Sequence, residues 1–125
     1  MTPPEGLNGN PPAVSVCVMK KRAQFLAANR GHRCGTKGFL LQGRDRGDGL
    51  DTVNVGFTCS KKVGNAVARN RAKRRLREIA RLTLPNKARP GWDYVLIGRA
   101  GATAERTFEK LLGDLRAALD TVHKG

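Results

Sequence analysis

The chain has 125 residues, of which 39% are hydrophobic, and this is enough for one modest core but argues against a second independent domain. Its 24 lysines and arginines face only 10 acidic residues, which gives a formal net charge of +14 and predicts a polyanionic partner. Nucleic acid is the favoured partner, because no long basic helix carries the Trp/Leu-rich apolar face that binds a membrane surface. We therefore expect no membrane association.

Four of the six prolines lie near the N-terminus, together with two glycines. This composition cannot bury apolar surface, so we predict a disordered tail over residues 1–13 and one folded domain over residues 14–125. The N-terminus lacks the basic and apolar regions of a signal peptide. Cys17, Cys34 and Cys59 are widely spaced and form no CxxC pair, which disfavours a disulfide framework and a zinc site. These features predict a cytoplasmic protein.

A short basic helix is predicted from about residue 14 to residue 30. Its apolar positions recur at helical spacing, and Gly31 follows as a stop signal. The apolar positions are Met19, Ala23, Leu26 and Phe25, and the basic residues among them are Lys20, Lys21 and Arg22.

Three strands and a second apolar helix are predicted downstream. Residues 37–44 contain an apolar run, and residues 52–59 alternate apolar with small polar side chains, the period of a half-buried strand. Residues 94–98 are apolar on both faces, as in an interior strand. An apolar stripe over residues 104–122 predicts a core helix with Thr103 as its N-cap. The order of these elements is typical of an α/β sandwich.

Residues 61–81 carry more than half of the net charge, because they hold nine basic residues and one acidic residue, Glu78. Asn65 can cap a helix in this segment. One face of that helix is apolar and is predicted to pack on the sheet, through Ala68, Ala72, Leu76 and Ile79. The opposite side carries Asn70, Arg74, Arg77 and Arg81, flanked by Arg69, Arg71 and Lys73.

This basic side is predicted to bind structured RNA. Arginine pairs two N–H donors with two phosphate oxygens, whereas lysine supplies a point charge, so an arginine-rich face favours a defined backbone geometry. The alternative is a charged face that is only solvated, as most charge runs are. That alternative is disfavoured, because like charges four residues apart destabilise a helix unless a counter-charge relieves them.

The run over residues 61–74 resembles the signature helix of bacterial ribonuclease P proteins. The Arg-Asn-Arg core of that signature stands here as Arg69, Asn70 and Arg71. Shorter similarities lie upstream, so that the resemblance covers roughly residues 18–122. The upstream segments are residues 20–25, 38–41 and 55–60.

The resemblance implies both a fold and a function. The fold is an α/β (α+β) two-layer sandwich with three helices and a central sheet of about four strands, one more than the residue patterns predict. It includes an unusual left-handed βαβ crossover around the basic helix, where general rules favour the right-handed form. The function is that of an RNA-binding subunit of ribonuclease P, which helps a catalytic RNA remove the 5′ leader from precursor tRNA.

The resemblance also implies which molecules and residues take part. The RNA subunit would carry the chemistry and bind most of the Mg²⁺, the protein would contact both that RNA and the precursor's leader, and no obligate protein partner is expected. The signature helix implies nine RNA-facing residues, to which the helical spacing adds Arg81. The nine are Lys61, Lys62, Asn65, Arg69, Asn70, Arg71, Lys73, Arg74 and Arg77.

The leader is expected in a cleft between the first helix and the uncovered face of the sheet. There Phe25 would either stack on a base or pack in the core, and its basic neighbours would attract phosphates. The sequence departs from the family pattern at Asn29, where some members carry a second aromatic residue, and at Gln42. Stacking on the leader is therefore expected to be weaker or differently placed. The basic neighbours are Lys20, Lys21 and Arg22.

No catalytic side chain and no metal site are predicted on the protein itself. His32 and His123 lie far apart and are expected at the surface, and no Asp/Glu cluster has metal-ligand spacing. Two other functions stay open. The first is a structural rRNA-binding protein of the ribosomal type, and the second is a DNA-binding protein, disfavoured because no convincing turn-helix pair is evident.

Overall fold

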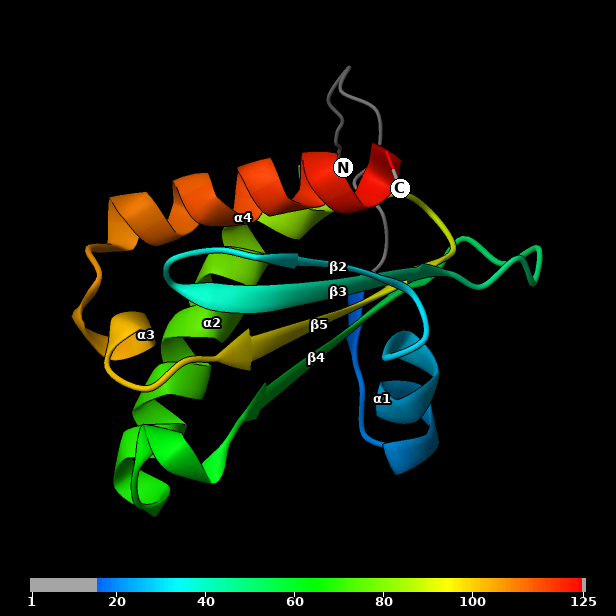
Figure 1. The fold of residues 1–125 in the computed structure, drawn as a ribbon. Helices are drawn as coiled ribbons and strands as arrows, with labels where there is room; N and C mark the ends of the chain where they lie inside the picture. The colour runs from blue at the N-terminus through cyan, green and yellow to red at the C-terminus, as the bar shows by residue number, and fades with distance from the viewer. Residues whose placement is uncertain (1–15, 125) are drawn as a thin grey trace, which may run out of the picture.

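The computed structural model describes residues 16–124 as a mixed sheet with helices packed on both of its faces (Figure 1). The predicted tail over residues 1–13 lies outside the described residues. The elements in chain order are β1 (Val16–Val18), α1 (Arg22–Ala28), β2 (His32–Gly35), β3 (Phe39–Asp45), β4 (Val53–Cys59), the 3-10 helix η1 (Lys61–Val63), α2 (Ala66–Lys87), β5 (Trp92–Gly98), α3 (Ala102–Glu105) and α4 (Phe108–Lys124).

The sheet has five strands in the order β1-β4-β5-β3-β2. β4 is parallel to both β1 and β5, whereas β3 is antiparallel to β5 and to β2. Because α2 connects the parallel neighbours β4 and β5, these three elements form the βαβ crossover that the resemblance implies. The left-handed sense of that crossover stays a prediction.

The main core lies between the sheet and the two long helices, α2 and α4. Alternate residues of the central strands point into it, and Phe39, Leu41, Tyr94 and Leu96 are fully buried there. On the other face, α1 covers a smaller cluster built around Val95. The sandwich predicted from the sequence is therefore confirmed, with α1 as a partial third layer.

The three predicted strands are confirmed as β3, β4 and β5, but the predicted number of strands is too low. The two additional strands are β1 and β2, which form the two edges of the sheet. Each is short and partly exposed, and neither shows the alternation of a half-buried strand. They are stabilised by pairing with other strands and not by a local pattern. β1 pairs with β4, which is distant in the chain, and β2 pairs with β3, which follows it after a turn.

The basic helix predicted from residue 14 to residue 30 is too long. Its first part is strand β1, and the helix α1 covers only Arg22–Ala28. The Met19 N–H donates to the Val55 carbonyl at 2.8 Å, which keeps the chain extended along β4 as far as that residue. The Gln24 side chain then accepts from the Lys21 N–H at 3.2 Å, and this hydrogen bond starts the helix late.

The structure has two helices, α3 and α4, where one helix was predicted over residues 104–122. The prediction of Thr103 as an N-cap is also wrong. Thr103 lies inside α3 and is fully buried. Its hydroxyl donates to the Gly38 carbonyl and accepts from the Arg99 N–H, so it ties α3 to the residue before β3 and the residue after β5. The chain turns between the helices at Arg106, whose guanidinium donates to Asp114 at 2.6 Å and 3.0 Å.

Arg46 holds the β3–β4 connection to the sheet. Its guanidinium donates to Asp93 at 2.8 Å and to the Thr52 carbonyl at 2.6 Å. Asp93 is 3% exposed, and Asn54 and Arg44 are its further partners. The buried carboxylate is thus balanced mainly by one arginine that reaches over from a loop.

Replacing Arg46 with methionine keeps an apolar stem but leaves the Asp93 carboxylate without its closest positive partner. Breaking a buried ion pair from one side costs roughly 3–5 kcal/mol, so we expect a loss of about 3 kcal/mol in the free energy of unfolding, measured by urea denaturation. The matched control is Lys87→Met, which removes an exposed pair with Asp120 and should cost about 1 kcal/mol or less. Equal losses in the two variants would contradict this account.

Candidate nucleic-acid interface

A tight turn after β4 sets the start of the basic helix α2. Gly64 has a φ of 135°, a backbone conformation that side-chain-bearing residues rarely adopt. Asn65 follows as the N-cap, and its side-chain oxygen accepts from the Ala68 N–H at 3.0 Å. The predicted cap is confirmed, and it leaves the amide N–H₂ of Asn65 as the part of the side chain able to meet another molecule.

The apolar side of α2 packs on the sheet, as predicted. Ala72, Leu76 and Ile79 are fully buried, whereas Ala68 is only half-buried because it lies in the first turn of the helix. The helix continues six residues beyond the predicted Arg81 and contains Pro85 near its end. A buried stripe of this length fixes the rotation of the whole helix, so the basic side chains point away from the core.

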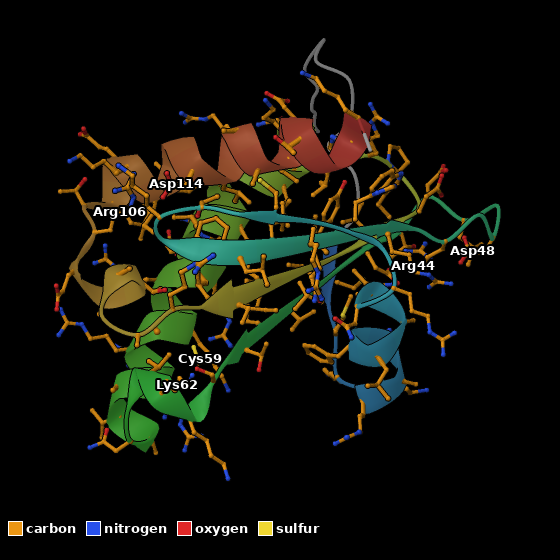
Figure 2. The ribbon with its side chains drawn as sticks, in the orientation of Figure 1. Arg44, Asp48, Cys59, Lys62, Arg106 and Asp114 are labelled. Atoms are coloured by element: carbon orange, nitrogen blue, oxygen red, sulfur yellow. The ribbon has the colours of Figure 1, made fainter. Side chains whose placement is uncertain are left out.

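Most of the side chains predicted to face RNA are exposed. Arg69 and Lys73 are half-buried, because they lie close to the edge of the buried stripe. The η1 turn adds two lysines at the N-terminal end of the helix, and Figure 2 shows Lys62 there, far from Arg44 on the sheet. The exposed members are Lys61, Lys62, Asn65, Asn70, Arg71, Arg74, Arg77 and Arg81.

This basic face has almost no internal counter-charge. Within residues 16–124, the only ion pairs that involve α2 are those of Arg81 with Glu78 and of Lys87 with Asp120. The Arg81 guanidinium donates to the Glu78 carboxylate and holds the pKa of that carboxyl below its ordinary value. Arg81 therefore already has a partner, while the other predicted basic residues make no ion pair among the described residues.

Two arginines of the basic run make specific contacts within the protein. Arg77 lies over the Phe57 ring, with 5.6 Å from its guanidinium carbon to the ring centroid, a cation–π contact. Arg75 points to the other side of α2 and donates to the Arg106 carbonyl. Arg75 thus ties α2 to the connection between α3 and α4, which explains a positive charge in the run that does not belong to the exposed face.

Cys59 lies beneath the first turns of α2 (Figure 2). Its thiol donates to the Arg69 carbonyl, with 3.8 Å between sulfur and oxygen. Burial raises the pKa of the Cys59 thiol, so it stays protonated and adds no negative charge to the basic face.

The residues predicted to bind the leader lie on the opposite face of the sheet. Lys20, Lys21 and Arg22 are exposed, and Phe25 is half-buried. The Phe25 ring packs on Gly56, where a Cβ atom would lie only 2.5 Å from the ring. The structure therefore does not bring the two predicted groups together: the sheet separates them.

A hollow that the sequence did not predict adjoins the C-terminal end of β5. Leu40 and Ile97 form its floor on the α1 side of the sheet, and Lys62 and Arg99 form its rim, around a volume of about 430 Å³. Arg99 directly follows β5, at the end of a parallel strand, and this position is the signal that could have identified it.

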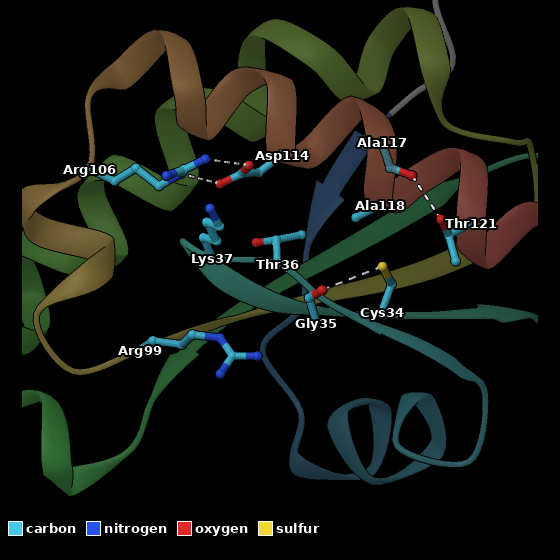
Figure 3. Close-up of a pocket in the computed structure, with 10 residues that line it drawn as sticks. All are labelled: Cys34, Gly35, Thr36, Lys37, Arg99, Arg106, Asp114, Ala117, Ala118 and Thr121. Carbon is cyan, nitrogen blue, oxygen red and sulfur yellow. Dashed lines mark hydrogen bonds and ion pairs between the residues drawn. The ribbon is translucent and has the colours of Figure 1, made fainter.

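A second hollow, of about 620 Å³, lies between the β2–β3 hairpin and α4 (Figure 3). Asp114 is the only carboxylate among its described lining residues and is paired with Arg106, so none of these residues is a free general base. The Arg99 guanidinium lies close to Gly35 at its edge. The lining adds positive charge beside the first hollow and offers no catalytic arrangement.

The two histidines differ in their surroundings. His32 is exposed, as predicted, but His123 is half-buried, which corrects the prediction of a surface position. The Tyr94 hydroxyl accepts from the Arg89 N–H at 2.9 Å and shares a hydrogen bond of 2.6 Å with His123 Nε2, in which the hydroxyl donates when the ring is neutral with its proton on Nδ1. Burial lowers the pKa of His123 and favours that neutral form. His123 therefore helps to pack the C-terminal turn of α4.

Comparison with known proteins gives a consistent result. The family described as Ribonuclease P matches residues 16–123. The ribonuclease P protein component of Ruegeria pomeroyi is 60% identical over 120 residues, which cover 90% of this chain and 96% of the relative. That of Caulobacter vibrioides is 50% identical over 101 residues, which cover 81% of this chain and 67% of the relative.

Solved structures agree with the sequence matches. The RNase P protein of Thermotoga maritima has a TM-score of 0.67 and 25% identity, and the match covers 86% of this chain and 96% of that one. The RNase P protein of Staphylococcus aureus has a TM-score of 0.66 and 28% identity, and the match covers 83% of this chain and 93% of that one. In the described residues, no helix is long and apolar enough to cross a membrane.

Arg74→Ala tests whether the exposed face of α2 contacts phosphate. If Arg74 pairs with one phosphate, the variant should reduce the slope of log affinity against log salt by about one counterion for a structured RNA. The same is expected for Arg69→Ala and for Arg71→Ala. Arg116→Ala, an exposed arginine on α4, is the control and should leave the slope unchanged. An unchanged slope in the Arg74 variant would place that side chain outside the interface.

Proposed function

Because the chain belongs to the ribonuclease P protein family, and is thus a subunit of the ribonucleoprotein that processes the 5′ end of tRNA, we propose a division of labour within that complex. The RNA subunit carries the chemistry of leader removal, and this chain contributes binding energy. One face of the sheet, covered by α2, meets the RNA subunit. The other face, next to α1, meets the leader of precursor tRNA. The family match also excludes the ribosomal alternative.

The observation that carries this proposal is the unpaired positive charge on α2. Arginines such as Arg71 and Arg74 are exposed on a helix whose other side is fixed in the core. Guanidinium groups held in this way match phosphates at defined positions and release the counterions condensed on the RNA. A folded RNA presents phosphates at fixed spacings, so a rigid arginine face selects it over a flexible polyanion.

Mg²⁺ belongs mainly to the RNA subunit in this proposal. The exposed side of α2 is positively charged and repels a divalent cation, whereas the RNA phosphates attract it. The chain can assist indirectly, because each phosphate it neutralises reduces the repulsion that Mg²⁺ must otherwise screen. The complex should therefore need less Mg²⁺ than the RNA alone.

The leader contact is proposed on the α1 side of the sheet. Lys20, Lys21 and Arg22 stand exposed at the start of α1, and Arg99 stands at the far end of the same face. Basic groups at both ends of a partly apolar surface suit a single strand, whose phosphates and bases alternate. Precursor tRNA has this leader and the product lacks it, so the contact favours the substrate.

The complex is proposed to work in the cytoplasm and to need no other protein. The positive charge of the chain suits RNA partners, and the reading as a duplex-DNA-binding protein has no support from the family match. In the described residues, α2 follows strand β4 and the η1 turn and precedes strand β5, so no helix joined to it by a short turn forms a turn-helix pair with it.

A cleavage assay with and without the RNA subunit tests the proposal. We expect that the chain alone cuts no precursor tRNA, and that adding it to the RNA subunit at limiting Mg²⁺ raises the rate of leader removal by about tenfold or more, the effect of about 1.4 kcal/mol. The control is the triple variant Arg69→Ala, Arg71→Ala and Arg74→Ala, which should lose most of the stimulation. An unchanged rate with the wild-type chain would overturn the assignment.

Phe25→Leu separates stacking on the leader from packing in the core. Leucine keeps apolar contact with Gly56 and Met19 but removes the aromatic face. If Phe25 stacks on a base, the complex should bind precursor tRNA about fivefold more weakly, the lower range for one stacked base. Mature tRNA, which has no leader, is the control ligand and should bind equally well. Equal losses for both ligands would mean that Phe25 only packs.

A further inference from the structure

A small apolar groove lies between β1 and α2, on the face of the sheet that α2 covers. Its volume is about 220 Å³, and it lies outside every group of residues assigned above to the leader. Its floor is apolar, and its rim carries two guanidinium groups. The floor includes Val18, Val55, Phe57 and Ala80, and the rim is formed by Arg77 and Arg81.

The groove exists because β1 ends early. Val16 and Val18 pair with Val53 and Val55 and therefore lie on the same face of the sheet, but the strand stops at Val18. Phe57, two residues further along β4, has no β1 side chain beside it. Val18 stays 50% exposed, which is a large exposed apolar surface next to a charged helix. The register of the sheet thus leaves an open position beside Phe57.

Arg77 is held in a position that suits a flat ligand. One side of its guanidinium lies over the Phe57 ring, at 5.6 Å. The side chain is exposed and has no ion-pair partner among residues 16–124. A guanidinium fixed on one side by an aromatic ring can stack a second flat group on its other side.

We propose that this groove receives one unpaired nucleobase of the RNA subunit, stacked against Arg77 and packed on the apolar floor beside Val18. The inference rests on the proposed function, because it takes α2 as the side that meets the RNA subunit. It adds a contact with a base to contacts that otherwise involve only phosphates.

The chemistry of the groove selects a nucleobase over other occupants. A base has two flat apolar faces and is joined to an anionic phosphate, so it matches an apolar floor beside the unpaired charge of Arg77. An apolar peptide side chain or a lipid chain would fill the floor but leave the charge of Arg77 without a partner. Recognition of RNA by proteins commonly uses unpaired bases that leave the stack in this way.

The position of the groove selects the RNA subunit over the leader. Arg77 and Arg81 belong to the same helix as the exposed arginines Arg71 and Arg74. Phe25, the proposed leader contact, lies on the opposite face of the sheet against Gly56. A leader strand on the α1 side would have to pass around the edge of the sheet to reach the groove.

Val18→Phe tests the proposal, because a larger side chain at this exposed position fills the groove without disturbing the core. We expect the affinity for the RNA subunit to fall about tenfold, within the range of one lost base stack, with an unchanged salt slope because no phosphate contact is lost. The matched control is Leu50→Phe, at a 63% exposed leucine in the β3–β4 connection, which should bind normally. Thermal unfolding of both variants checks that they fold.

Chemical footprinting of the RNA subunit gives the second measurement. The wild-type chain should protect one unpaired base from a base-modifying reagent, and Val18→Phe should lose that protection while the backbone protections by α2 remain. Unchanged affinity or continued protection of the base would overturn the groove proposal and leave the proposed function standing. If the wild-type chain protected neither the base nor the RNA backbone, the proposed function itself would be overturned.

Discussion

The structure depends on holding a row of like charges on one helix, α2, against their mutual repulsion. Arginines one turn apart repel each other, and the described acidic residues leave most of them unpaired. The opposing stabilisation comes from the far side of α2, where Leu76, Ile79 and Leu84 are fully buried against the sheet and α4. The repulsion that remains in the free chain is relieved when phosphates arrive, so it favours the complex over the separate components.

The parts of the fold that could be predicted are those with a local signal. The alternation in β4 and the apolar stripe of α2 report which side is buried, and the apolar run in β5 indicates a strand covered on both faces; the structure confirms all three. The edge strands β1 and β2 could not be found in this way, because they are defined by pairing with strands elsewhere in the chain. Thr103 was misassigned for a related reason, since its hydroxyl partner Gly38 lies 65 residues away.

The candidate interface was predictable in outline because charge and helical spacing are both visible in the sequence. Two details were not. Arg81 belongs to the exposed side by spacing, yet it is paired with Glu78, three residues away. Arg99 was overlooked because a single arginine after a strand carries no pattern, and only the folded sheet places it beside Lys62. The surroundings of such residues depend on which segments come together in the fold, and no local sequence pattern indicates this.

The continuous buried stripe of α2 has a consequence for how this chain can diverge between species. Each residue of an α-helix advances by about 100°, so inserting or deleting one residue midway would turn every later side chain away from its place. Leu76 and Ile79 would then swing toward water while neighbouring arginines swung toward the sheet. Exchanges between arginine and lysine on the outer side leave the buried stripe unchanged, apart from Arg77, whose guanidinium lies over the Phe57 ring. Among relatives, the residue types of this segment should therefore vary, but its length should be constant.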